Sequence, residues 1–172
     1  MEVGQVILLT NIDCIGGQKQ SLFKTVRPAI VRTIHSPNHI SVRLLTTIYT
    51  EEKEKPLTLA NAKKELYHHL KKENLMMHQV VLLCPEKDGI LDYSYVYGNL
   101  YTCTFEVNRS NVTLLWDSNH QPVMIDRHTE QMIAEAETQA AIEQIQKEYV
   151  IEFHHEYDKV LGQSVLFKCQ KM

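Results

Sequence analysis

Histidines could bind a metal ion or move protons, and nine of them are spread along this chain. His35 and His39 lie four residues apart, which is metal-ligand spacing on a helix, but they flank a predicted hairpin turn and would not converge. His68-His69 and His154-His155 are adjacent pairs, whose side chains diverge on a helix or a strand alike. The HExxH motif of zinc enzymes does not occur. The histidines therefore predict no metal site.

Other catalytic signatures are also absent from the sequence. It contains no GxSxG motif, no P-loop and no GxGxxG fingerprint. Acidic residues are plentiful in the second half, but without a known cleft no two of them can be named as general acid and base. No cofactor is therefore expected.

Length and composition fit one globular domain. The chain has 172 residues, of which 44% are hydrophobic and 23% are charged. No apolar run approaches the roughly 18–20 residues that cross a bilayer. The N-terminal sequence MEVGQVILLT lacks the basic segment of a signal peptide. We therefore expect a cytoplasmic protein that does not enter a membrane, with its four scattered cysteines present as thiols.

Charge is divided unevenly along the chain. Residues 1–72 contain 11 Lys and Arg against 6 Asp and Glu, a balance of +5. Residues 73–172 contain 7 against 15, a balance of −8, and the two halves sum to the net charge of −3. Such asymmetry can indicate a surface that faces a polyanion. It can equally be a solvated charged face, so both interpretations stay open.

The apolar pattern predicts an α+β fold. A strand is expected at residues 3–11, a hairpin within residues 24–50 with its turn at residues 36–39, and a helix at residues 59–72 capped by Thr58. Further strands are expected at residues 76–84, 90–97, 99–108 and 111–116. A long helix should follow from about residue 127 to 147. The tail is expected to hold a short strand after residue 149, a turn near residue 157 and a strand at residues 164–169.

Three tyrosines alternate along the strand expected at residues 90–97. Tyr93, Tyr95 and Tyr97 would share one face of that strand, because side chains alternate with a period of two. Such a face could stack nucleic-acid bases. Packing against a neighbouring element is the more common use of such a face, and it is the interpretation favoured here.

Three segments in the first third of the chain are informative when read in order. They are GQVILL at residues 4–9, KTVRPAIV at residues 24–31 and VRLLTT at residues 42–47, with a glycine-containing loop after the first. This ordered set resembles the opening of the MazF/PemK family of toxin endoribonucleases, over about residues 3–50. The chain departs from that family in lacking a glycine directly before Arg27 and in being longer than a usual member.

The resemblance implies a fold, an activity and partners. The fold would be a single PemK-like domain over residues 1–172, a small SH3-like antiparallel barrel with added helices and a long C-terminal helix. An insertion would lie at about residues 51–98 and a C-terminal extension at about residues 149–172. The activity would be metal-independent cleavage of single-stranded RNA to a 2′,3′-cyclic phosphate and a 5′-hydroxyl. The partners would be an antitoxin protein and a second copy of the chain.

The resemblance also assigns residues. Arg27 would lie over the scissile phosphate, with Thr46 beside it, or Thr47 after a one-residue shift of register. A guanidinium is always charged and can bind two phosphate oxygens, and a threonine hydroxyl can donate a further hydrogen bond. Histidine could assist proton transfer near neutral pH. The residues expected to contact the flanking RNA are Lys24, Arg32, Arg43, His35 and His39.

Two other functions are compatible with the same sequence. The chain could be a catalytically inactive SH3-like barrel that binds nucleic acid or protein, because the acidic second half would repel RNA unless it faces away. It could also be a gyrase-directed or plasmid-maintenance protein on a related fold that acts through its long helix.

Overall fold

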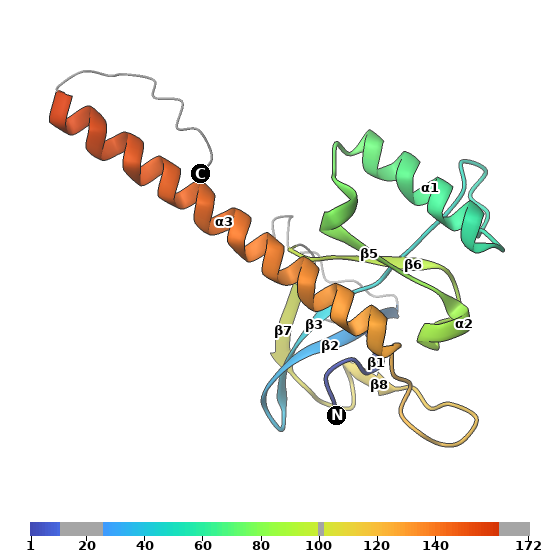
Figure 1. Ribbon diagram of the computed structural model, residues 1–172. Helices are drawn as coiled ribbons and strands as arrows, with labels where there is room; N and C mark the ends of the chain where they lie inside the picture. Colours follow the sequence, from blue (N-terminus) through green and yellow to red (C-terminus); the bar gives the residue numbers. More distant parts are fainter. Residues whose placement is uncertain (11–25, 100–101, 162–172) are drawn as a thin grey trace.

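The computed structural model describes residues 1–10, 26–99 and 102–161 and has an α+β architecture. Within these residues, eight strands form two antiparallel sheets, accompanied by three α-helices and one short 3-10 helix. Figure 1 shows the smaller sheet above the larger one, with the C-terminal helix α3 running alongside.

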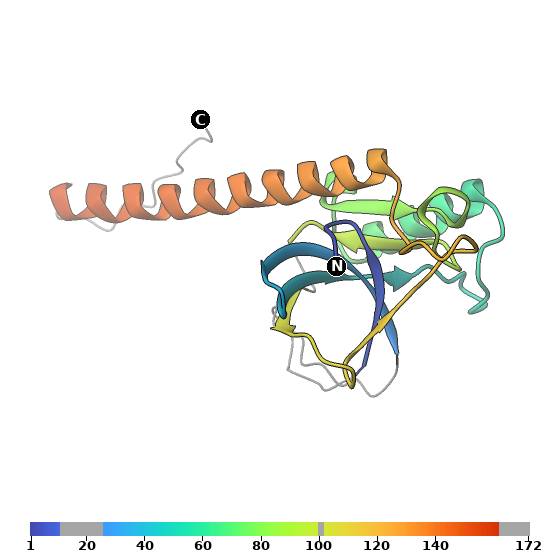
Figure 2. The same ribbon diagram turned by 90° about the horizontal axis from the view of Figure 1, so that it is seen from below.

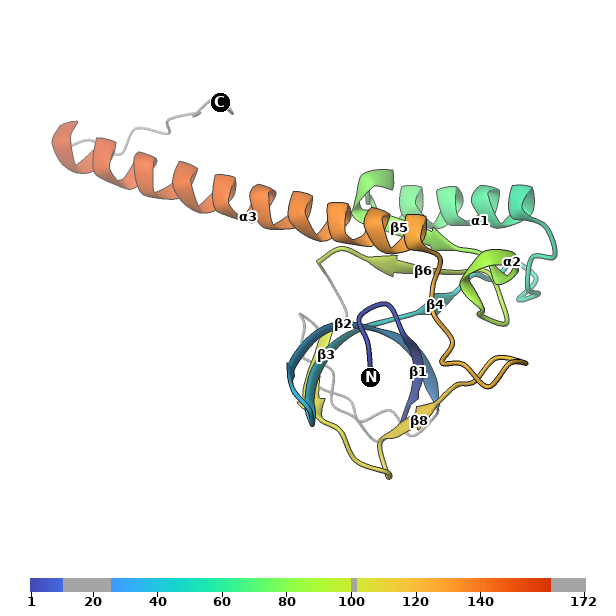
Figure 3. The ribbon, with the colours of Figure 1, turned by 60° about the horizontal axis from the view of Figure 1, so that its bottom comes forward.

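The larger sheet has the strand order β7-β3-β2-β1-β8, and each neighbouring pair is antiparallel. Its strands are β1 (Val6–Leu9), β2 (Arg27–Ser36), β3 (His39–Leu44), β7 (Thr102–Glu106) and β8 (Val112–Leu114). The sheet is strongly curved (Figure 3). No pairing joins its edge strands β7 and β8 among the described residues, so these residues do not form a closed barrel.

The first half of strand β2 is buried on both faces at Ala29, Ile30 and Val31, which explains this run of aliphatic residues. Ala29 and Val31 belong to a core inside the curve of the larger sheet. Ile30 points the other way, into a second core that includes Leu83 of the smaller sheet and Ile133 of α3. Because side chains alternate along a strand, this one strand links both cores.

The smaller sheet has the order β4-β6-β5, with β4 (Thr46–Thr47), β6 (Ser94–Tyr97) and β5 (Val80–Leu83). The 3-10 helix η1 (Met77–Gln79) precedes β5, and the short helix α2 (Pro85–Asp88) follows it. Helix α1 (Leu59–Lys72) packs on this sheet through a stripe made of Ala62, Leu66 and Leu70. Its first turn is capped by Thr58, whose hydroxyl accepts a hydrogen bond from the Asn61 backbone N–H at 3.2 Å.

Helix α3 (Arg127–Leu161) is the longest element. Its first half packs on the body of the protein through Ile133 and Ala136, and its second half projects away from the other elements (Figures 1 and 2). Gly98, just after β6, allows the close approach, since a Cβ atom there would lie 2.6 Å from the Ala136 carbonyl oxygen. Larger side chains at position 98 would push this helix outward.

The structure confirms part of the predicted organisation and corrects part of it. The hairpin formed by β2 and β3 and the helix α1 are confirmed. The short strand expected after residue 149 and the turn near residue 157 are wrong, because α3 continues to Leu161. The strand expected at residues 164–169 lies outside the described residues. No helix in residues 1–10, 26–99 or 102–161 is both long enough and apolar enough to cross a membrane.

The prediction that all four cysteines are thiols is also wrong. Cys84 is a free, buried thiol. Cys103, in β7, is buried and disulfide-bonded.

Candidate active site

A cavity of about 370 Å³ lies where the two sheets and helix α1 meet, and we call it the Arg27 cavity. Strands β2, β3, β4 and β6 and the end of α1 contribute to it. Its lining residues are Arg27, Leu44, Thr46, His69, Glu73, Tyr95 and Tyr97. Residues from four strands and the end of one helix therefore come together at one place. Five of the seven side chains carry an ionisable group, namely Arg27, His69, Glu73, Tyr95 and Tyr97.

Backbone hydrogen bonding explains how Arg27 and Thr46 reach this cavity together. Arg27 is the first residue of β2 and Thr46 is the first residue of β4. The backbone N–H of Leu45 donates to the Pro28 carbonyl oxygen at 2.9 Å, which joins the two strand starts. Thr46 pairs with Tyr95 in the smaller sheet. Arg27 and one threonine therefore lie at the same cavity because backbone hydrogen bonds hold the starts of β2 and β4 together.

The register of β4 distinguishes the two threonines. Thr46 lines the Arg27 cavity, whereas Thr47 lines a different cavity together with Pro28 and Trp116. Successive residues of a strand point to opposite sides, so only one of the two can share a site with Arg27. In this structure that residue is Thr46.

A histidine and two tyrosines form a hydrogen-bonded cluster in the same cavity. His69 Nε2 lies 2.9 Å from the Tyr95 hydroxyl oxygen and 3.4 Å from that of Tyr97. The two tyrosine rings pack edge to face, with centroids 5.4 Å apart, and both residues are largely buried. The tyrosines therefore hold the imidazole in a defined position. Glu73, the capping residue directly after α1 and four positions after His69, adds a carboxylate.

Arg32 and Arg43 bind helix α3. Arg32 Nε lies 2.6 Å from Glu137 Oε1, and Arg32 Nη1 lies 3.0 Å from Glu130 Oε1. Arg43 Nη2 lies 3.5 Å from Glu137 Oε2. The side chains of Arg32 and Arg43 are only 7% and 11% exposed. Burial lowers the pKa of Arg43, against the opposing attraction of Glu137. The predicted role of these arginines in holding RNA phosphates does not fit this arrangement, because carboxylates of α3 already occupy them.

Glu137 is the residue on which this network depends, and its replacement should destabilise the protein. We expect Glu137→Gln to lower the free energy of unfolding by about 2–4 kcal/mol, because it leaves two buried guanidinium groups without their shared carboxylate. Urea denaturation measures the change. Glu135→Gln is the matched control, since Glu135 is exposed on the same helix and forms no ion pair among the described residues. Equal effects of the two changes would contradict this account.

His35 and His39 lie at the hairpin end of β2 and β3, far from Arg27. His35 Nε2 is 2.7 Å from the Ser41 hydroxyl oxygen, and the rings of His35 and His39 lie 5.5 Å apart. Eight residues of strand separate His35 from Arg27, which at about 3.3 Å per residue is more than about 20 Å. The prediction that either histidine assists chemistry at Arg27 is therefore not supported. Lys24 lies outside the described residues.

The three alternating tyrosines in and just before β6 do not all line the same cavity. Tyr95 and Tyr97 line the Arg27 cavity, as described. Tyr93 instead donates a hydrogen bond from its hydroxyl to Glu86 Oε1 at 2.5 Å. All three rings are also packed in the core beneath α1, as the packing interpretation predicted.

The Tyr93–Glu86 hydrogen bond should be visible in an alkaline titration. It raises the pKa of Tyr93 to about 12, with a smaller contribution from burial, and it lowers the pKa of Glu86. A raised folded-state pKa contributes stability that is complete below pH about 10, the ordinary tyrosine value, and is lost as the pH rises towards 12. We expect Tyr93→Phe to remove a phenolate transition centred near pH 12 in a spectrophotometric titration. Loss of a transition at the ordinary tyrosine pKa would contradict the bond.

Sequence reasoning missed His69 and Glu73 as residues of this cavity. His69 was set aside because His68-His69 is an adjacent pair, and only one member of such a pair can face the sheet. The available signal was its position, because His69 lies three residues after Leu66 on the buried stripe of α1. Glu73 carried no comparable signal, whereas Tyr95 and Tyr97 had been named with Tyr93 as one face of a strand.

No three His, Cys, Asp or Glu side chains of the described residues are grouped as ligands of a metal ion would be. A comparison of the whole sequence with protein-family models found no match, and a comparison with curated proteins also found none.

Proposed function

We propose that this protein is a metal-independent endoribonuclease that cleaves single-stranded RNA in the Arg27 cavity. The observation that carries the proposal is the meeting of Arg27 and Thr46 with His69, Tyr95 and Tyr97 in one cavity. Arg27 and Thr46 are also the two residues that the sequence resemblance assigns to the scissile phosphate. The cavity also contains side chains that can move protons, His69 and Glu73.

The proposed reaction uses the 2′-hydroxyl of the RNA as the nucleophile. The 2′-oxygen attacks phosphorus and the bond from phosphorus to the 5′-oxygen breaks, which gives a 2′,3′-cyclic phosphate and a 5′-hydroxyl. One proton leaves the 2′-oxygen and one reaches the 5′-oxygen, so no water is consumed. His69 and Glu73 lie one helical turn apart in the lining and together supply a proton donor and a proton acceptor.

Arg27 and Thr46 would stabilise the charge that develops on the phosphoryl oxygens. A guanidinium can bind two of these oxygens at once, and the threonine hydroxyl can donate a third hydrogen bond. The hydrogen bonds between His69 Nε2 and the hydroxyl groups of Tyr95 and Tyr97 would position the imidazole in the cavity. Tyr95 and Tyr97 are positioning residues in this scheme.

The broader features of the resemblance belong to the same proposal. We infer a cytoplasmic toxin that is inhibited by an antitoxin protein, acts as a homodimer, and has a PemK-like domain of the SH3-like barrel type. The curvature of the larger sheet supports the fold assignment (Figure 3). The alternative, an inactive binding module, is favoured by one observation, the occupation of Arg32 and Arg43 by carboxylates of α3.

Incubation of a long single-stranded RNA with purified protein in EDTA tests the proposal. We expect discrete fragments that end in a cyclic phosphate. Intact RNA at high protein concentration, with no inhibitory partner present, would overturn the endoribonuclease proposal and leave the binding module.

The two threonines provide an internal test of register. We expect Thr46→Val to lower the cleavage rate by about tenfold, which corresponds to the free energy of about one hydrogen bond. Valine matches the shape of threonine but lacks the hydroxyl. Thr47→Val should leave the rate within about twofold, since Thr47 lines a different cavity. Single-turnover cleavage rates of the two variants decide the matter. A larger loss in Thr47→Val would contradict the assignment of Thr46.

A further inference from the structure

A larger cavity, of about 770 Å³, lies between the first turns of α1 and α3, beside strand β5. None of its lining residues belongs to the Arg27 cavity. The volume falls in the range of about 300–1,000 Å³ that is typical of small-molecule sites. We call it the α1–α3 cavity.

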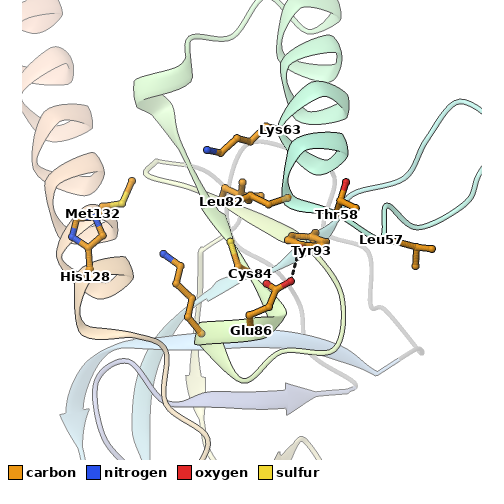
Figure 4. Close-up of a pocket in the computed structure, with 11 residues that line it drawn as sticks. Leu57, Thr58, Lys63, Leu82, Cys84, Glu86, Tyr93, His128 and Met132 are labelled. Atoms are coloured by element: carbon orange, nitrogen blue, oxygen red, sulfur yellow. Dashed lines mark hydrogen bonds between the residues drawn. The ribbon is translucent and has the colours of Figure 1, made fainter.

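Apolar groups form most of the wall of the α1–α3 cavity. Leu82 and Cys84 come from β5 and the residue after it, and Met132 faces them from α3 (Figure 4). Leu57 and Leu59, at the start of α1, complete the apolar surface, and both are exposed. An uncovered apolar wall of this kind favours a ligand with an apolar body.

Nitrogen-bearing side chains from three different helices border the same cavity. Lys63 of α1, Lys87 of α2 and His128 of α3 all line it. In Figure 4 the amine of Lys63 points from α1 towards α3, and His128 lies on the opposite side. None of the three side chains forms an ion pair or hydrogen bond within the described residues. Three separate elements thus place unpaired nitrogen groups around one apolar hollow.

Two further observations concern charge in this cavity. Burial and the nearby carboxylates of Asp88 and Glu86 raise the pKa of the Cys84 thiol, while Lys87 and, more weakly, Lys63 lower it, so the charges of both lysines reach the cavity wall. The first turns of α1 and α3 border the cavity, and the N-terminal ends of helices favour anions. The one carboxylate in the lining, that of Glu86, accepts the hydrogen bond of Tyr93.

We propose that the α1–α3 cavity binds a small amphipathic anion, with its apolar body against Leu82, Cys84 and Met132 and its acidic group between Lys63 and Lys87. A carboxylate with a medium-length alkyl chain has this chemistry. The site is separate from the Arg27 cavity, so it does not depend on the proposed ribonuclease activity.

Calorimetric titration of the full-length protein with decanoate, below its micelle concentration, tests the site. We expect saturation at one decanoate per chain. Acetate has the charge without the apolar body and 1-decanol has the body without the charge, and both should bind at least about tenfold more weakly. The double variant Lys63→Met/Lys87→Met should weaken decanoate binding by about 5- to 20-fold. Lys64→Met/Lys71→Met, two exposed lysines of α1 outside the lining, is the matched control and should bind as the wild type does.

Protection of Cys84 places the bound anion. Cys84 is a free thiol in the cavity wall, so decanoate should slow its alkylation by iodoacetamide in the wild type, as measured on the Cys84 peptide by mass spectrometry. Protection should be weaker in the Lys63→Met/Lys87→Met variant at the same decanoate concentration. The proposal is overturned by absence of decanoate binding, by equal binding of 1-decanol, by equal losses in the two double variants, or by binding that leaves Cys84 unprotected.

Discussion

Arg27→Ala is expected to lower the rate of RNA cleavage by about 100- to 1,000-fold, the usual effect of removing one preorganised donor from a developing oxyanion. Arg27 is the one cationic side chain in the lining of its cavity that is charged at every working pH. Arg32 and Arg43, the other arginines of β2 and β3, cannot replace it, because they are bound to carboxylates of α3. The effect should appear in single-turnover rates at saturating protein.

The Arg27→Ala result can be separated from misfolding and from loss of general RNA affinity. Arg27 is exposed at the start of β2, and urea denaturation of the Arg27→Ala variant shows whether it remains folded. Arg109→Ala removes an exposed arginine in the turn between β7 and β8 and should cleave at the wild-type rate. Arg27→Lys should recover only part of the rate, because an ammonium cannot bind two phosphate oxygens in a fork. Equal rates for Arg27→Ala and Arg109→Ala would contradict the role of Arg27.

His69→Ala is expected to lower the cleavage rate by about 100- to 10,000-fold, the range attributed to a positioned general acid or base. His69 is the imidazole of the cavity, and Tyr95 and Tyr97 hold its Nε2 at 2.9 Å and 3.4 Å. The neighbouring residue gives a matched control, because His68 is exposed on the same helix and does not line the cavity. His68→Ala should therefore retain the wild-type rate.

Added imidazole gives a second measure of the role of His69. The alanine variant leaves space in the cavity, and imidazole in solution should restore part of its cleavage rate if His69 moves a proton. Tyr95→Phe should reduce the rate less than His69→Ala and shift its pH profile, since it removes only the hydrogen bond that positions the ring. A His69→Ala variant that cleaves at the rate of His68→Ala would show that the imidazole has no part in the reaction.

The local pattern of the sequence was enough to predict the hairpin that begins near Arg27, but it placed Thr46 in the second strand of that hairpin, whereas Thr46 lies in β4 of the smaller sheet. Residues 36–39 have turn chemistry between two β-rich runs, so the hairpin of β2 and β3 was predictable from neighbouring residues alone. The same holds for α1, where Thr58 caps the helix and Leu66 and Leu70 belong to its apolar stripe. The choice between Thr46 and Thr47 was not predictable, because it depends on the pairing of Thr46 with Tyr95, about fifty residues away.

The role of the arginines after Arg27 was hidden for a related reason. Arg32 and Arg43 were predicted to contact the RNA that flanks the scissile phosphate. Their partners, Glu130 and Glu137, lie about a hundred residues later, on α3. The residues near Arg32 and Arg43 in the sequence do not indicate ion pairs over so long a separation. Part of the charge asymmetry between the two halves is therefore an attraction within the molecule, which binds α3 to the larger sheet.

Cleavage of a matched pair of substrates tests the central claim most directly. One is an all-RNA oligonucleotide that contains a cleaved site, and the other is identical except for a single 2′-deoxynucleotide on the 5′ side of the scissile phosphate. In EDTA, we predict that the wild-type protein cuts the first to a 2′,3′-cyclic phosphate and leaves the second intact, because the nucleophile has been removed. Cleavage of both oligonucleotides, or of neither, would contradict an endoribonuclease that uses the 2′-hydroxyl of its substrate.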